Sequence, residues 1–149
     1  MRIIIVFLLV TTAVFSQQID YNTKKGFVAE GFDVVSYFTQ KSPVEGKNKF
    51  QVTFENAKFK FASQENLKLF NANPKKYIPQ YGGYCAYAMA VKKTKMNIDA
   101  EQYEIRDGKL YLFYSSWFGS KLKDWQEGET KKLQSKADIN WLDLKYQKN

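Results

Sequence analysis

The only cysteine of the chain, Cys85, stands four residues before Met89 in the stretch YGGYCAYAMA at residues 81–90. A thiolate and a thioether one helical turn apart are ligands that a soft ion such as Cu(I) prefers. Met96 follows closely enough to supply a third sulfur. The pattern therefore indicates a copper-like metal site. Two alternatives stay open: a thiol packed in the core, which is common for free cysteine, and a redox or covalent role.

The same stretch also indicates a pocket for a small ligand. Gly82 and Gly83 are typical of a tight turn or of a close approach of the backbone to another group. Tyr81, Tyr84 and Tyr87 flank this turn. Aromatic side chains with polar tips, placed around a glycine turn, are suited to lining a binding pocket. They are equally typical of core residues whose hydroxyl groups reach the rim, so both interpretations stay open.

The chain contains no histidine. Ser-His and Cys-His catalysis, zinc sites with histidine ligands and histidine pH switches are therefore excluded. The carboxylates show no paired arrangement, because Asp33 fits a helix cap and Asp107 fits a turn. The sequence favours a protein that is not an enzyme. A thiol-dependent enzyme would require a lowered pKa of the Cys85 thiol.

The net charge of +8 comes almost entirely from lysine. The lysines are spread along the chain, and Arg2 and Arg106 are the only arginines. Nucleic-acid recognition favours arginine and clustered patches, so we expect a solvated lysine surface and no nucleic-acid partner. A weak attraction to anionic surfaces remains compatible with this charge.

Residues 1–16 have the form of a secretory signal peptide. Arg2 precedes a short apolar run. Val14 and Ser16 then provide residues that a signal-peptide cleavage site accepts at its −3 and −1 positions. The run is too short for a comfortable membrane span, so we expect an exported protein, periplasmic or secreted, with no stable span in its mature form. A retained N-terminal anchor helix is the alternative. A single cysteine then excludes an internal disulfide. We expect residues 17–30 to form an N-terminal extension and residues 31–144 to form one domain.

Two patterns of alternating residues predict β-hairpins. The first covers residues 50–63, where the phenylalanines share one face, and the second covers residues 101–116 around the turn Asp107-Gly108. Ser63 predicts the start of a helix that ends at Asn73-Pro74.

Three further helices are expected. One covers residues 83–93, with a strand as the alternative, and one begins at Ser115 or Ser116 and places Trp117 on its face. The last covers residues 129–142. The chain is predicted to be a small single α+β domain, in which β-hairpins pack with short helices and two helices lie at the C-terminus.

Several blocks within residues 31–141 resemble exported YHS-domain proteins of bacteria: GFDVVSYF, FKFASQENLKLFNANPKKYIPQYGGYCAYAMA, DGKLYLFYS and KADINW. The resemblance implies a small hairpin-and-helix unit related to metal-handling domains. In cysteine-bearing members, an aromatic-His-Phe-Cys-Ser run is followed by a second cysteine. Here Lys60, Ala62 and Asn66 occupy the histidine and cysteine positions, so that metal chemistry does not carry over. The GGYCAYAMA block is shared with the exported members.

Together, the residues and the resemblance favour an exported, non-catalytic binding module for a soft metal ion or a small ligand. The alternative is a structural or protein-interaction domain in which Cys85 is buried and inert. A metal ion or another protein is the expected partner.

Overall fold

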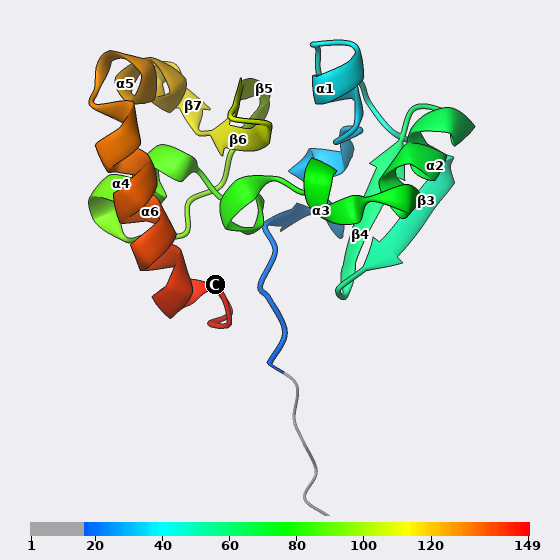
Figure 1. The fold of residues 1–149 in the computed structure, drawn as a ribbon, viewed down its shortest axis with the longest axis horizontal. Helices are drawn as coiled ribbons and strands as arrows, with labels where there is room; N and C mark the ends of the chain where they lie inside the picture. Colours follow the sequence, from blue (N-terminus) through cyan, green and yellow to red (C-terminus); the bar gives the residue numbers. More distant parts are fainter. Residues whose placement is uncertain (1–16) are drawn as a thin grey trace, which may run out of the picture.

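The computed structural model describes residues 17–149, so the predicted signal peptide at residues 1–16 lies outside the described residues. Figure 1 shows two halves. A small sheet with α2 and α3 forms the sheet half, and α4, α5 and α6 form the helical half. The β5–β6 hairpin lies between them. One continuous set of buried residues runs through both halves. The short helices and the mainly antiparallel small sheets confirm the predicted α+β fold class.

The strands form three small sheets. A four-stranded sheet has the order β1-β2-β4-β3, in which only the β2–β4 pair is parallel, while β5–β6 and β7–β8 are separate hairpins. The strands are β1 Thr23–Lys24, β2 Phe27–Val28, β3 Lys47–Phe54, β4 Ala57–Phe61, β5 Asp99–Arg106, β6 Lys109–Phe113, β7 Ser115–Ser116 and β8 Gly119–Ser120.

The two predicted hairpins are present as β3–β4 and β5–β6. Both turns use left-handed residues, Glu55-Asn56 in the first and Asp107-Gly108 in the second, which match the twist of a two-residue hairpin. Phe59 is buried on the inner face of β4, as the alternating pattern predicts. Residues 17–30 supply β1 and β2 to the sheet, while the predicted division at residue 31 stays a prediction.

The helices are short except for the last one. They are α1 Ser36–Thr39, α2 Gln64–Ala72, α3 Pro74–Tyr77, α4 Ala86–Lys92, α5 Lys121–Glu127 and α6 Thr130–Leu144, with 3₁₀ turns η1 at Ala29–Gly31 and η2 at Gln80–Gly83. Ser63 caps α2 as predicted, because its Oγ accepts from the Asn66 N–H at 3.1 Å. Within residues 17–149, no helix combines the length and apolar character needed to cross a bilayer.

The prediction of a helix beginning at Ser115 or Ser116 is wrong. Residues 115–120 form the β7–β8 hairpin, and Gly119 has a φ of +130°, which a helix does not allow. Helix α5 begins only at Lys121, where the Oγ of Ser120 accepts from the Leu122 N–H at 3.1 Å. Trp117 therefore lies in a turn and is almost fully exposed.

Asp33 is completely buried and joins three segments of the sheet half. Its Oδ1 caps α1 by accepting from the Val35 N–H at 2.9 Å, as expected of a capping aspartate. Its Oδ2 accepts from the Ala62 N–H at 2.8 Å and from the Asn66 side-chain amide at 2.7 Å. This carboxylate thus ties α1 to the end of β4 and to α2.

Substitution Asn66→Ala should lower the free energy of unfolding by about 1–3 kcal/mol, because the buried Asp33 carboxylate loses one of its hydrogen-bond donors. Urea denaturation measures the change. Asn71 lies exposed on the same helix and provides the matched control. Asn71→Ala should change stability by no more than about 0.5 kcal/mol. Equal effects of the two substitutions would show that the carboxylate cluster does not stabilise the fold.

Candidate functional site

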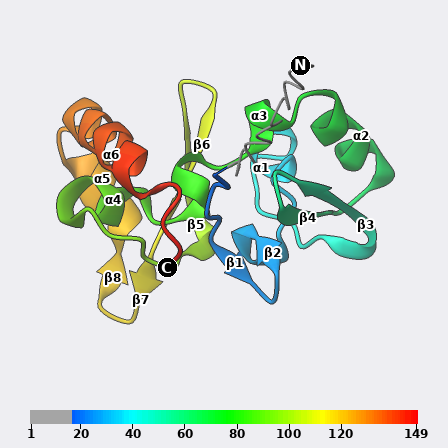
Figure 2. The same cartoon turned by 90° about the horizontal axis from the view of Figure 1, so that it is seen from below.

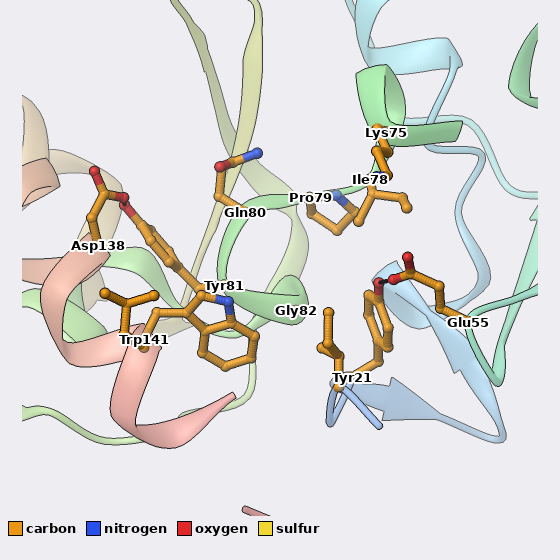
Figure 3. A pocket seen from close by; sticks show the side chains of 12 residues that line it. Tyr21, Glu55, Lys75, Ile78, Pro79, Gln80, Tyr81, Gly82, Asp138 and Trp141 are labelled. Atoms are coloured by element: carbon orange, nitrogen blue, oxygen red, sulfur yellow. Dashed lines mark hydrogen bonds between the residues drawn. The ribbon is translucent and has the colours of Figure 1, made fainter. Parts of the chain in front are cut away.

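A pocket of about 450 Å³ opens where the sheet half meets the helical half (Figure 3). Four stretches of chain line it: Ile19 and Tyr21, Glu55 in the β3–β4 turn, residues 75–82 and α6 residues 138–142. We call it the junction pocket. Its walls combine aromatic rings with charged groups, and they come from segments far apart in the sequence.

Two tyrosines on the wall of the junction pocket donate to carboxylates. The Tyr81 hydroxyl donates to Asp138 Oδ1 at 2.9 Å, and the Tyr21 hydroxyl donates to Glu55 Oε2 at 2.8 Å. Burial, together with the neighbouring carboxylate, raises the pKa of each phenol far above its ordinary value. Both phenols therefore stay protonated. Within residues 17–149, the second oxygen of each carboxylate accepts no hydrogen bond, which leaves it available to a ligand.

Gly82 is required at the floor of the pocket. It has a φ of +62°, and a Cβ atom added there would lie 2.7 Å from the Asp20 carbonyl oxygen and 2.8 Å from the Trp141 ring. Tyr81 before it also adopts a left-handed conformation, with a φ of +55°. Such a conformation is uncommon for a bulky residue and persists only where the surroundings impose it.

Residues 19–22 form an N-terminal strap that holds the two halves together. The Asp20 N–H donates to the Lys145 carbonyl at 2.7 Å, beyond the end of α6. The Asp20 carboxylate pairs with the almost buried Lys95 at 2.7 Å and accepts from the Tyr84 hydroxyl at 2.7 Å. The Asn22 N–H donates to the Gly82 carbonyl at 2.8 Å. In Figure 2 this segment runs between the two halves.

The structure divides the five residues predicted to form a ligand pocket. Tyr81 and Gly82 line the junction pocket. Gly83 and Tyr84 are buried and contact the strap, since the Gly83 carbonyl accepts from the Asn22 side chain at 3.1 Å. Tyr87 is half-buried in α4, with the Lys121 ammonium 5.5 Å from its ring centroid.

The three sulfur residues lie together at the start of α4. The Cys85 N–H donates to the Met96 carbonyl at 2.9 Å, and Met89 follows one turn along the helix. The side chains of Cys85 and Met89 are 0% exposed, and Met96 is half-buried. Within residues 17–149, no group of three or more histidine, cysteine or acidic side chains is placed to hold a metal ion. A metal here would depend on the sulfurs and the main chain.

The Cys85 thiol is a poor nucleophile in this environment. Burial raises its pKa, and main-chain hydrogen bonds from Ala88, Tyr114 and Tyr87, with the charge of Lys121, oppose the shift only in part. The thiolate is the reactive form, so a thiol held protonated inside the core reacts slowly.

Two of the three positions that the resemblance assigns to metal ligands meet at Asp33, but the residues present do not fit a soft metal. Ala62 and Asn66 both donate to Asp33 Oδ2, at 2.8 and 2.7 Å. The Lys60 ammonium lies 4.0 Å from the centroid of the Phe27 ring in a cation–π contact. Hydrogen-bond donors to one carboxylate thus occupy the two positions that the resemblance assigns to cysteine ligands, and a lysine in contact with an aromatic ring occupies the histidine position.

Comparison with protein-family models identifies residues 35–81 as a YHS domain. The chain therefore contains a YHS domain, which runs from the start of α1 into the η2 turn. The matched residues end at Tyr81, so Cys85, Met89 and Met96 lie beyond them. Comparisons with curated proteins and with solved structures found no match.

Several residues of the junction pocket were not predicted. The sequence pattern predicts the hairpin whose turn contains Glu55 and the last helix, which contains Trp141, and both elements are present. It contains no signal that Tyr21 would reach Glu55 across the hairpin or that Asp138 would meet Tyr81. Such pairs depend on how the two halves pack.

We expect Cys85 to resist a water-soluble thiol reagent in the native protein, because labelling requires local opening of the core around α4. Labelling should be at least about a hundredfold slower than in denaturant. The control is Ser135→Cys in a Cys85→Ala background, since Ser135 is exposed on α6. Native labelling of Cys85 as fast as that of the control would contradict the buried, protonated thiol.

Proposed function

We propose that this protein is an exported, non-catalytic binding module whose site for a small organic ligand is the junction pocket. The observation that carries the proposal is a pair of hydrogen bonds, from the Tyr21 phenol to Glu55 and from the Tyr81 phenol to Asp138. In the described chain, each carboxylate keeps one oxygen that accepts no hydrogen bond from the protein. Export to the periplasm or out of the cell is part of the proposal, and it depends only on the sequence of residues 1–16.

The walls of the junction pocket favour a ligand with an apolar or aromatic body and hydrogen-bond donors or a positive charge. Trp141, Ile78 and Pro79 offer apolar surface, as Figure 3 shows. Glu55 and Asp138 offer acceptors at opposite sides, and aromatic rings attract cations. Lys75 at the rim adds a single positive charge. An amine or quaternary ammonium compound with a ring fits this set of groups.

The YHS domain supplies only part of this site. Residues 75–81 lie at the end of the matched segment, whereas the strap and α6 lie outside it. The presence of a YHS domain is consistent with a binding module. The choice of ligand in this proposal depends on the residues that the helical half adds.

Removing the charge of Asp138 should weaken ligand binding. We expect a panel of aromatic amines and quaternary ammonium compounds to contain ligands that raise the melting temperature. Asp138→Asn should weaken them about tenfold by calorimetry, since it removes one charge-assisted contact. Asp143→Asn is the matched control, because Asp143 lies on the same helix and pairs with Lys93 at the surface. A panel without ligands, or equal affinities for the two variants, would contradict the proposal.

A soft-metal site at Cys85, Met89 and Met96 is the second candidate. One observation favours it: the hydrogen bond from the Cys85 N–H to the Met96 carbonyl holds the third sulfur residue beside the pair. Since Cys85 and Met89 are completely buried, an ion such as Cu(I) would enter only when the start of α4 opens.

The second candidate predicts that the wild-type protein competes for Cu(I) with a chromophoric chelator. Cys85→Ser should bind at least about tenfold more weakly, because it loses the thiolate ligand. Met89→Leu, which keeps the side-chain volume, separates loss of a ligand from loss of packing. Equal and weak binding by wild type and Cys85→Ser would remove the metal site and leave a structural or protein-interaction domain with an inert cysteine.

A further inference from the structure

Two adjacent aromatic side chains are fully open to water. Trp117 is 96% exposed and Phe118 is 97% exposed, at the turn between β7 and β8. We call this pair the aromatic tip. Leu69, Ile139 and Leu142 are also exposed in the described chain, but each keeps a larger part of its surface covered. Trp and Phe each carry about 150–250 Å² that burial would remove from water, so such a pair indicates an interaction site.

The aromatic tip is a formed turn and not a loose end. The backbone pairs Ser115 with Ser120 and Ser116 with Gly119, and the Phe118 N–H donates to Ser116 Oγ at 3.2 Å. Small residues flank the two rings, so the tip is narrow and convex. A narrow apolar tip with a polar base is suited to entering the boundary between the headgroups and the acyl chains of a bilayer, where Trp and Phe are favourable.

The positive charge of the protein complements an anionic bilayer. In Figure 2 the β7–β8 hairpin and the β1–β2 hairpin project from the same side of the molecule, while the β5–β6 hairpin projects from the opposite side. The β1–β2 hairpin carries Lys24 and Lys25, both exposed. Lys24 pairs with Glu30, whereas Lys25 has no ion pair within residues 17–149. Lysines near a membrane surface attract anionic headgroups.

We propose that the aromatic tip docks the protein onto the surface of an anionic lipid bilayer. Trp117 and Phe118 enter the interface, and Lys25 lies at the level of the headgroups. The net charge of +8, or +7 without Arg2 of the predicted signal peptide, strengthens the contact without a membrane-spanning segment in the described chain. The proposal is independent of the junction pocket, since neither hairpin tip lines it.

Vesicles of equimolar phosphatidylcholine and phosphatidylglycerol test the proposal by co-sedimentation. The wild-type protein should sediment with them and should bind more weakly at high salt or to pure phosphatidylcholine. Trp117→Ser with Phe118→Ser should lose at least about tenfold in partitioning. The matched control is Leu69→Ser with Ile139→Ser, which removes exposed apolar side chains elsewhere and should bind like wild type.

Two further comparisons locate the contact. Lys25→Gln should bind more weakly than Lys109→Gln, which changes the same charge at the β5–β6 turn on the opposite side. Vesicles should shift the tryptophan emission to the blue, and Trp117→Phe should abolish most of the shift while vesicle binding persists. Trp125 is already buried and Trp141 packs against the core, so both should contribute little to the shift.

Three results would overturn the proposal. One is a wild-type protein that stays in the supernatant with anionic vesicles, and another is a serine variant of the aromatic tip that binds as well as wild type. The third is self-association by sedimentation velocity that the serine variant loses, with no vesicle binding, which would assign the aromatic tip to a contact between copies of the chain. Far-ultraviolet circular dichroism checks that each variant is folded.

Discussion

The close approach of three chain segments at Gly82 is the constraint on which the rest of the structure depends. The Asp20 carbonyl of the strap and the Trp141 ring of α6 both reach a position that only a residue without a Cβ atom can occupy. The strap also forms main-chain hydrogen bonds, from the Asp20 N–H to Lys145 and from the Asn22 N–H to Gly82. The two halves are fixed to each other at this point, and the junction pocket opens beside it.

The buried Asp33 carboxylate is a second constraint, and it lies where the resemblance would place a metal site. Asp33 gathers the end of β4, α1 and α2 around one buried carboxylate. Two of its donors belong to the positions that the resemblance assigns to cysteine ligands. These two positions still meet at one centre, but that centre is the Asp33 carboxylate and not a metal ion. The YHS domain of this chain is therefore stabilised by hydrogen bonds at that centre, and its candidate binding site lies elsewhere.

Local patterns predicted much of the fold. Alternation and turn residues placed both main hairpins, and the Ser63 cap placed α2, because these features depend on neighbours in the sequence. The helix expected from Ser115 fails because Gly119 has a backbone conformation that ends any helix there. Trp117 was assigned to a helix face for its spacing, although spacing alone does not show whether a ring is covered.

The candidate site was predictable only in part. Tyr81 and Gly82 were identified from local composition, whereas Tyr21 and Asp138 enter the pocket through contacts between distant segments. The role of Asp33 as a cap was visible from its neighbours, but its second oxygen bonds to residues about thirty positions away. Long-range polar pairs of this kind follow from packing and leave no periodic signal.

The central claim is that ligands bind where the strap, η2 and α6 meet. Mapping of amide chemical shifts in ¹⁵N-labelled protein, during titration with a ligand from the amine panel, tests it most directly. The account predicts that the perturbed amides cluster at residues 19–22, 80–82 and 138–142, with small changes around α4. Perturbations centred on Cys85 and Met96, or scattered over the surface without saturation, would contradict it.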